Sequence, residues 1–226
     1  MKLLYVDAGR SGVLLPLVEI APIGGVYLPE ISRAIIERYS FTQPPNFTPD
    51  VVEKNGIVFG MGKLSVDEVG SQAINKLILT RDGVLAECFS TEAAKLVIDD
   101  LLPWLVEEFG FRKSVPAPDH LYVASNLVVK FERSLAKLFG GLDAVLKMAS
   151  SLLQARYGFE KPVTVSRLSV EVDPTTVAGP ASSATAFAIE RQLNYPFSDN
   201  RFWCQAPIHT QDHIRFLEDI ERLLAD

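Results

Sequence analysis

The sequence has little of what a disulfide-linked or metal-binding protein needs, with two cysteines and three histidines in 226 residues. Cys88 and Cys204 form no CxxC pair and lie far apart, so we expect reduced, buried thiols and not a disulfide or a zinc site. The apolar N-terminal segment is interrupted by Asp7, Arg10 and Glu19, so we expect neither a signal peptide nor a membrane span there. These absences predict a cytoplasmic protein without membrane contact.

Positive charge is also scarce, because 22 Lys and Arg residues stand against 28 Asp and Glu, giving a net charge of −6. An acidic surface repels phosphate backbones, so the composition disfavours nucleic-acid binding. The aromatic residues are dispersed among apolar neighbours without interleaved basic residues, which disfavours a base-stacking surface as well. The 48% hydrophobic share is typical of an ordered globular chain.

No stretch carries a motif specific enough to name a reaction. The segment 60–65, GMGKLS, brings glycines, a lysine and a serine together, but its spacing matches neither a P-loop nor a dinucleotide fingerprint. We therefore expect a glycine-punctuated strand there. The sequence predicts no cofactor and no activated nucleophile.

What is present is a mixture of strand-like alternation and helical periodicity. Helices are expected at 29–39, 91–109, 134–157 and 211–224, and strands at 2–6, 13–20, 55–63, 74–89 (as a hairpin), 121–131, 163–172, 187–193 and 202–206. A kink or break is expected at Pro103, and a bulge near Arg167 where the apolar alternation slips by one residue. The pattern predicts the α+β class, a mostly antiparallel sheet with about four helices packed on it.

The prolines at 116 and 118 mark the best boundary between two α+β halves, 1–112 and 119–226, although one continuous domain is equally compatible with the pattern. Both halves end in paired strands followed by a helix, at 74–109 and 184–224. An ancient duplication would produce this order, but the two sequences are too dissimilar to establish one.

His209, Asp212 and His213 form the sharpest chemical cluster, since two histidines four residues apart share one face of a helix and could hold a metal. Thr210 stands where a zincin motif has its glutamate, so the general base is missing. Thr210 is also a natural N-cap, which would leave His209 outside the helix. A metal-assisted hydrolase and a simple capped helix are the two alternatives.

A run of small residues, VAGPASSATA at 177–186, separates two expected strands. Small side chains expose backbone donors, and Ser182, Ser183 and Thr185 add hydroxyl groups, so the run is a candidate small-ligand site. The alternative is an ordinary hairpin loop.

The long helix expected at 134–157 carries an apolar stripe with the spacing of three and four residues. Its members include Leu135, Leu138, Leu142, Val145 and Leu152. Such a stripe needs cover, either from the chain's own sheet or from a subunit contact as well. The pair Gly140-Gly141 is expected to shorten the helix or to let another backbone approach.

The leading hypothesis is a non-catalytic protein that acts through protein–protein contacts, associating with itself or joining a larger assembly. It rests on the apolar helix and on the lack of a reactive cluster. The first alternative is a small-ligand sensor or binding domain, and the second is the metal-assisted hydrolase.

Overall fold

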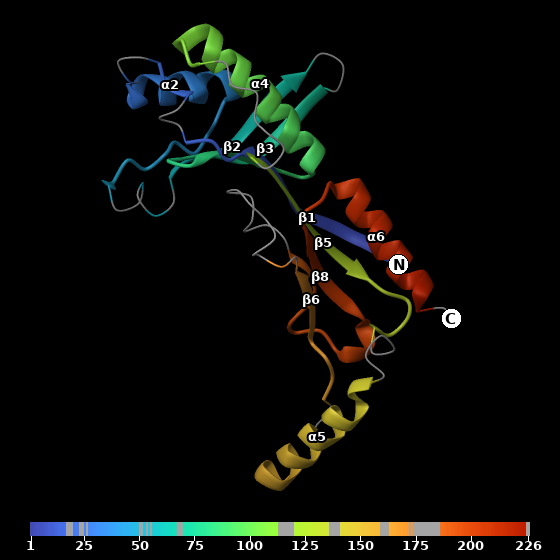
Figure 1. The fold of residues 1–226 in the computed structure, drawn as a ribbon. Coiled ribbons are helices and arrows are strands. Elements are labelled where there is room, and N and C mark those ends of the chain that lie inside the picture. The colour runs from blue at the N-terminus through green and yellow to red at the C-terminus, as the bar shows by residue number, and fades with distance from the viewer. Residues whose placement is uncertain are drawn as a thin grey trace.

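Eight strands pair into one antiparallel sheet in the computed structural model of the chain (Figure 1), in the order β2-β3-β4-β1-β5-β8-β7-β6. The strands are β1 (Lys2–Val13), β2 (Ile57–Val66), β3 (Gly70–Thr80), β4 (Gly83–Cys88), β5 (Leu121–Lys130), β6 (Arg167–Glu171), β7 (Ala186–Arg191) and β8 (Arg201–Ala206). The structure describes all residues except 17–19, 23, 24, 26, 50, 51, 53, 55, 67–69, 113–119, 136–140, 159–162, 172, 174–185, 225 and 226.

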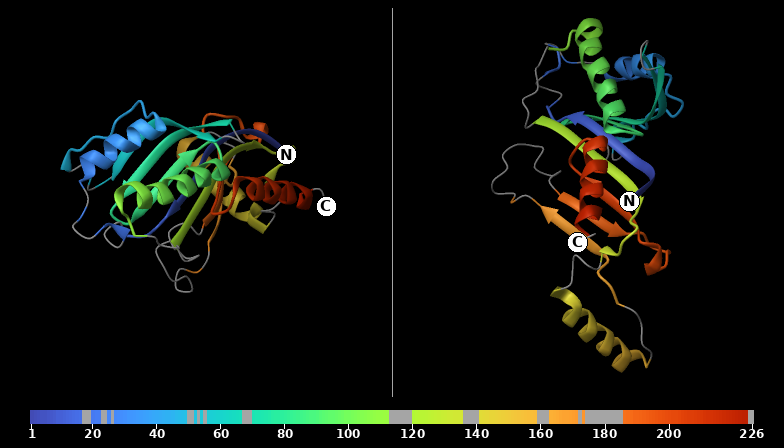
Figure 2. Two further views of the ribbon diagram at one scale, coloured as in Figure 1. Left: turned by 90° about the horizontal axis from the view of Figure 1, so that it is seen from above. Right: turned by 90° about the vertical axis from the view of Figure 1, so that its right-hand side faces the viewer.

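The four described α-helices are α2 (Leu28–Tyr39), α4 (Thr91–Phe109), α5 (Asp143–Tyr157) and α6 (Thr210–Leu223). Helices α2, α4 and α6 lie on one face of the sheet, whereas α5 lies beyond its end (Figure 2). The predicted α+β class, with an antiparallel sheet and about four helices, is confirmed. None of the described helices combines the length and the apolar character that crossing a bilayer requires.

The two halves of the chain repeat one order of elements: a strand, a helix, three strands and a helix. From either edge of the sheet inward, the second, third and fourth strands of a half are followed by its first strand, so β1 and β5 lie side by side at the centre. The pairing runs from Lys2 with Lys130 to Val13 with Leu121, so the halves share one continuous sheet. The division into two domains at 112 and 119 stays a prediction.

Local sequence explains the best-predicted elements. Ser90 precedes α4, and its hydroxyl accepts a hydrogen bond from the backbone N–H of Ala93, as an N-cap does. Gly110 ends the helix with a left-handed φ of 66°, a conformation that glycine adopts without steric cost. The hairpin of β3 and β4 turns at Arg81 and Asp82, as predicted.

Several boundaries differ from the expectations. One strand, β1, replaces the two expected at 2–6 and 13–20, because its pairing with β5 carries it through Gly9 and Gly12. Helix α4 continues through Pro103, so the break into two helices that was one of the two expectations is wrong; Leu101 and Leu105, on either side of the proline, are both buried in the core. Helix α5 begins at Asp143 instead of 134, after Gly141.

Two smaller differences concern the last third of the chain. No bulge lies at Arg167, because β6 begins there and pairs regularly with β7. His209, and not Thr210, is the N-cap of α6, and its side chain makes no capping hydrogen bond. The Thr210 side chain is used elsewhere, in a contact with α4.

Candidate interaction surface

Helix α5 carries apolar side chains that the other described residues leave uncovered. None of its residues is buried, and Val145 and Leu152 are 57% and 65% exposed. Figures 1 and 2 show it beyond the end of the sheet, away from the other three helices. The expectation that the stripe covers the chain's own sheet is therefore wrong, because α5 does not reach the sheet face.

The predicted stripe residues do not stay together. Leu135 precedes α5 and is buried in the C-terminal core, so it cannot belong to an exposed surface. Leu138 lies outside the described residues. Leu142, Val145 and Leu152 are all exposed, and together with Met148 they make up the surface that we call the α5 stripe.

An apolar part of the sheet face is also uncovered, at the β6–β7 edge. Val170 of β6 is 57% exposed, although it points to the face that carries α6. Its neighbour Phe187 packs on Phe216 of α6, with ring centroids 5.2 Å apart. Exposed apolar surface on both a helix and a sheet edge of one chain is typical of an interaction site.

The corresponding place in the N-terminal half is occupied by α2. Ile31, Ile35 and Tyr39 of α2 are buried there. The guanidinium of Arg38 donates two hydrogen bonds to Asp100 of α4, at 2.8 and 3.1 Å, and lies over the Trp104 ring at 4.9 Å. The Tyr39 hydroxyl donates to the same carboxylate at 2.7 Å.

These contacts raise the pKa values of the two side chains at the end of α2. Burial, followed by the hydrogen bond to Asp100, raises the pKa of Tyr39 above its usual value. The hydrogen bond to Asp100 raises the pKa of Arg38. Both groups are therefore fixed as proton donors, and α2 is held to α4 by a charge-assisted contact.

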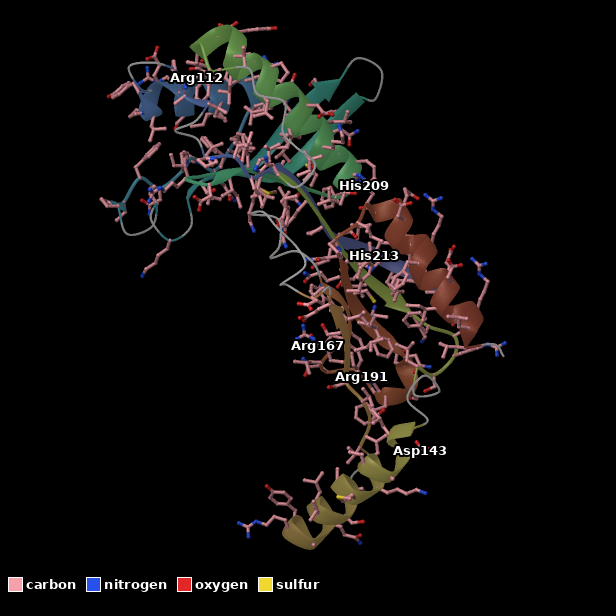
Figure 3. The ribbon with its side chains drawn as sticks, viewed as in Figure 1. Arg112, Asp143, Arg167, Arg191, His209 and His213 are labelled. Atoms are coloured by element: carbon pink, nitrogen blue, oxygen red, sulfur yellow. The ribbon has the colours of Figure 1, made fainter. Side chains whose placement is uncertain are left out.

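The predicted metal residues do not converge. The Nδ1 atom of His213 lies 2.7 Å from the Ser125 hydroxyl on β5, and burial lowers the pKa of His213 to about 4. Asp212 is exposed and pairs with Arg215 in the next turn. His209 stands at the start of α6 (Figure 3). Across the described residues, no three His, Cys, Asp or Glu side chains are placed to hold a metal ion.

Thr91 and Thr210 join the two halves at the starts of α4 and α6. The backbone N–H of Thr91 donates to the Thr210 hydroxyl at 3.0 Å, and the backbone N–H of Thr210 donates to the Thr91 hydroxyl at 2.8 Å. Both residues are buried. This reciprocal pair agrees with a two-fold arrangement of the halves, and reasoning from the sequence alone missed it.

A groove of about 430 Å³ opens beside this junction, between α4 and the central strands. Its polar lining comes from Ser11, Lys95, Asp99, Tyr122 and His209. The Nδ1 atom of His209 is enclosed and has no hydrogen-bond partner in the described part of the chain. A separate apolar cavity of about 240 Å³ lies under the C-terminal half of α4, lined by Phe111 and Arg112 among others.

The predicted ligand residues Ser182, Ser183 and Thr185 lie outside the described residues. On the sheet face that carries no helix, two pairs of polar side chains connect different strands. Arg10 donates to Glu87 at 2.8 Å, and the Trp203 indole donates to Asp7 at 3.1 Å.

Comparison with known proteins gives little. No family model matches the chain. No curated protein matches it either. Among solved structures it is similar to a chain described as Methanococcus jannaschii TBP, with 13% identity, a TM-score of 0.41, and coverage of 99% of this chain and 97% of that one. Values this low establish no relationship in function.

Proposed function

We propose that the protein is a non-catalytic binding protein that acts through protein–protein contacts and associates with copies of itself. The observation that carries this proposal is the α5 stripe, an apolar surface on a helix with no buried residue. Full burial of one large apolar side chain contributes about 1.5–3 kcal/mol, so covering several of them favours association strongly. We place the protein in the cytoplasm, since its two cysteines are free and buried.

Light scattering across a micromolar concentration range tests the proposal. The unaltered chain should form dimers or larger species, and Leu152→Glu should shift it to monomer because the charge cannot be buried unpaired. Leu193→Glu is the matched control, since Leu193 is also exposed but lies on the β7–β8 connection. A strict monomer at every concentration, indistinguishable from Leu152→Glu, would contradict the proposal.

The groove beside His209 supports a second candidate function, binding of a small molecule. It offers apolar walls with a few polar groups, including the enclosed Nδ1 atom of His209, which a ligand donor would satisfy. A thermal-shift screen against nucleotides and metabolites tests it. A ligand at 100 times its dissociation constant should add about 2.7 kcal/mol of stability. This gain should be lost in His209→Ala, and a flat screen retires the candidate.

A further inference from the structure

The two halves end their first helix in the same way. Helix α2 follows the first strand of its half and ends in Arg38-Tyr39, and α5 follows the first strand of the other half and ends in Arg156-Tyr157. In α2 the arginine is held by Asp100 of the following long helix. The position of α2 therefore indicates what surface the end of α5 is suited to contact.

The reciprocal hydrogen bonds of Thr91 and Thr210 fix the register between α4 and α6. Each threonine is the first residue of its helix. Asp100 lies nine residues after Thr91, and Asp219 lies nine residues after Thr210. Asp219 is thus the α6 counterpart of the carboxylate that binds Arg38.

The surroundings of Asp219 have the same apolar character but are uncovered. Phe216 is the counterpart of Val97, and it is 36% exposed where Val97 is fully buried. Leu223 is the counterpart of Trp104, the residue on which Arg38 and Tyr39 pack, and it is 69% exposed. Together with Val170, these residues form what we call the α6 docking face.

We infer that α5 of one copy docks on the α6 docking face of a second copy, with Arg156 paired to Asp219 and the exchange made in both directions. The inference rests on the proposed self-association and adds its location. It reproduces between two chains the contact that α2 and α4 make within one.

Two observations favour a second copy over closure on the same chain. Helix α5 lies beyond the end of its own sheet (Figures 1 and 2). The connection from α5 to its next strand, 158–166, is nine residues long, against seventeen for the equivalent connection from α2, 40–56. Short connections favour exchange of an element between copies, and a two-fold exchange forms the contact twice.

Charge is complementary as well. Helix α5 carries Asp143, Lys147 and Arg156, a net charge of +1. Helix α6 carries two arginines and four acidic residues, a net charge of −2 with its buried histidine neutral. Asp219 itself is 59% exposed at its side chain and pairs within α6 only with Arg222 among the described residues, one turn away.

Cross-linking of two single-cysteine chains tests the location. One chain carries Gln154→Cys near the end of α5, the other carries Arg222→Cys beside Asp219, and they are mixed with a short bismaleimide. The native Cys88 and Cys204 are buried, so we expect them not to react. A cross-linked heterodimer should form about tenfold faster than with Ala144→Cys, the control at the far end of α5, because docked side chains react at millimolar effective concentration.

Charge reversal provides an independent test. Arg156→Asp and Asp219→Arg should each raise the dissociation constant of the dimer about 3- to 10-fold, and the double variant should return to within about twofold of the original, as a paired contact requires. Lys147→Asp changes the net charge equally and should have the smaller effect. Equal effects of Lys147→Asp and Arg156→Asp, or no restoration in the double variant, overturn the pairing.

The outcomes separate the two proposals. A dimer by light scattering without the cross-link overturns the docking face but leaves self-association standing. A monomer in which Gln154→Cys and Arg222→Cys on one chain cross-link internally shows that α5 closes on its own α6 and overturns the second-copy assignment. A monomer without any cross-link overturns self-association itself.

Discussion

Helices α2 and α5 occupy the same place in the order of their halves, but only α2 covers the strands that follow it. The N-terminal half has 21 buried residues in its apolar core and the C-terminal half has 9, counted over the described residues. Three of the additional residues are Ile31, Ile35 and Tyr39 of α2, whereas no residue of α5 is buried. The N-terminal half thus buries one side of its first helix, whereas among the described residues the C-terminal half leaves its first helix and Val170 exposed.

The C-terminal half has a core of its own although α5 does not cover its strands. Its core is built by α6 on β5, β8 and β7, where Leu217, Leu127 and Cys204 belong to one buried cluster. The central pairing of β1 with β5 and the Thr91–Thr210 contact connect it to the larger core. We therefore expect α5 to contribute to association and not to monomer stability.

The largest difference should come from truncating one residue in each helix. Ile35→Ala removes a fully buried side chain and should lower the free energy of unfolding by about 2–5 kcal/mol. Leu152→Ala should change it by about 0.5 kcal/mol or less in dilute solution, because Leu152 is exposed. Urea unfolding at low protein concentration measures both. Equal losses at every concentration would mean that α5 packs on its own chain.

The free energy of unfolding should depend on pH through the C-terminal half. His213 of α6 can bind a proton, whereas its counterpart on α4, Ala94, cannot. Burial lowers the pKa of His213 to about 4 in the folded chain, against about 6.5 when unfolded. The unfolded state therefore binds the extra proton between these values, and stability falls as the pH drops from about 6.5 to 4, by up to about 3 kcal/mol. Above pH 6.5 this contribution is fully present.

Unfolding of the original chain and of His213→Gln at a series of pH values isolates this contribution from that of the carboxylates. The amide can still bond to the Ser125 hydroxyl but does not titrate. The variant should lose the steep part of the slope. Identical slopes in the two proteins would show that His213 is not buried as a neutral group.

Replacing either threonine of the Thr91–Thr210 contact should lower the free energy of unfolding by a similar amount. Thr91→Val and Thr210→Val each leave a buried backbone N–H of the other helix without its acceptor, which costs about 1–3 kcal/mol. The two losses should be similar, and the double variant should lose less than their sum because the residues share one contact. Chemical denaturation of the four proteins measures this coupling. Strongly unequal losses would contradict the two-fold equivalence, and additive losses would contradict the shared contact.

The smallest change in stability should come from replacing Arg38 or Arg156, the arginines in the last turns of α2 and α5. Arg38→Ala should cost about 1 kcal/mol of unfolding free energy, since its ion pair with Asp100 is partly exposed and its stacking on Trp104 adds little more. Arg156→Ala should leave the monomer unchanged and weaken only association. Thermal unfolding at low and high concentration separates the two cases. A concentration-independent loss in Arg156→Ala would show an intrachain contact.

Much of the fold was predictable because it follows local rules. Alternation indicated the hairpin of β3 and β4, and the cap at Ser90 with the glycine at 110 indicated both ends of α4. The candidate site was harder to predict. Spacing grouped His209 with His213, yet Ser125, far away in the sequence, lies against His213. The matching ends of the two helices, Arg38-Tyr39 and Arg156-Tyr157, are a further local signal of the equivalence between the halves.

The sequence by itself determined that a helix near residue 150 is apolar along one side, because periodicity is a local property of the chain. Only the tertiary structure decided that this side stays uncovered, since cover depends on which strands and helices meet it in space. It also decided that Thr91 contacts Thr210, which is 119 residues away in the sequence. That contact sets the register in which Asp219 of α6 corresponds to Asp100 of α4. Contacts between segments so distant in the sequence leave no periodic pattern in either one.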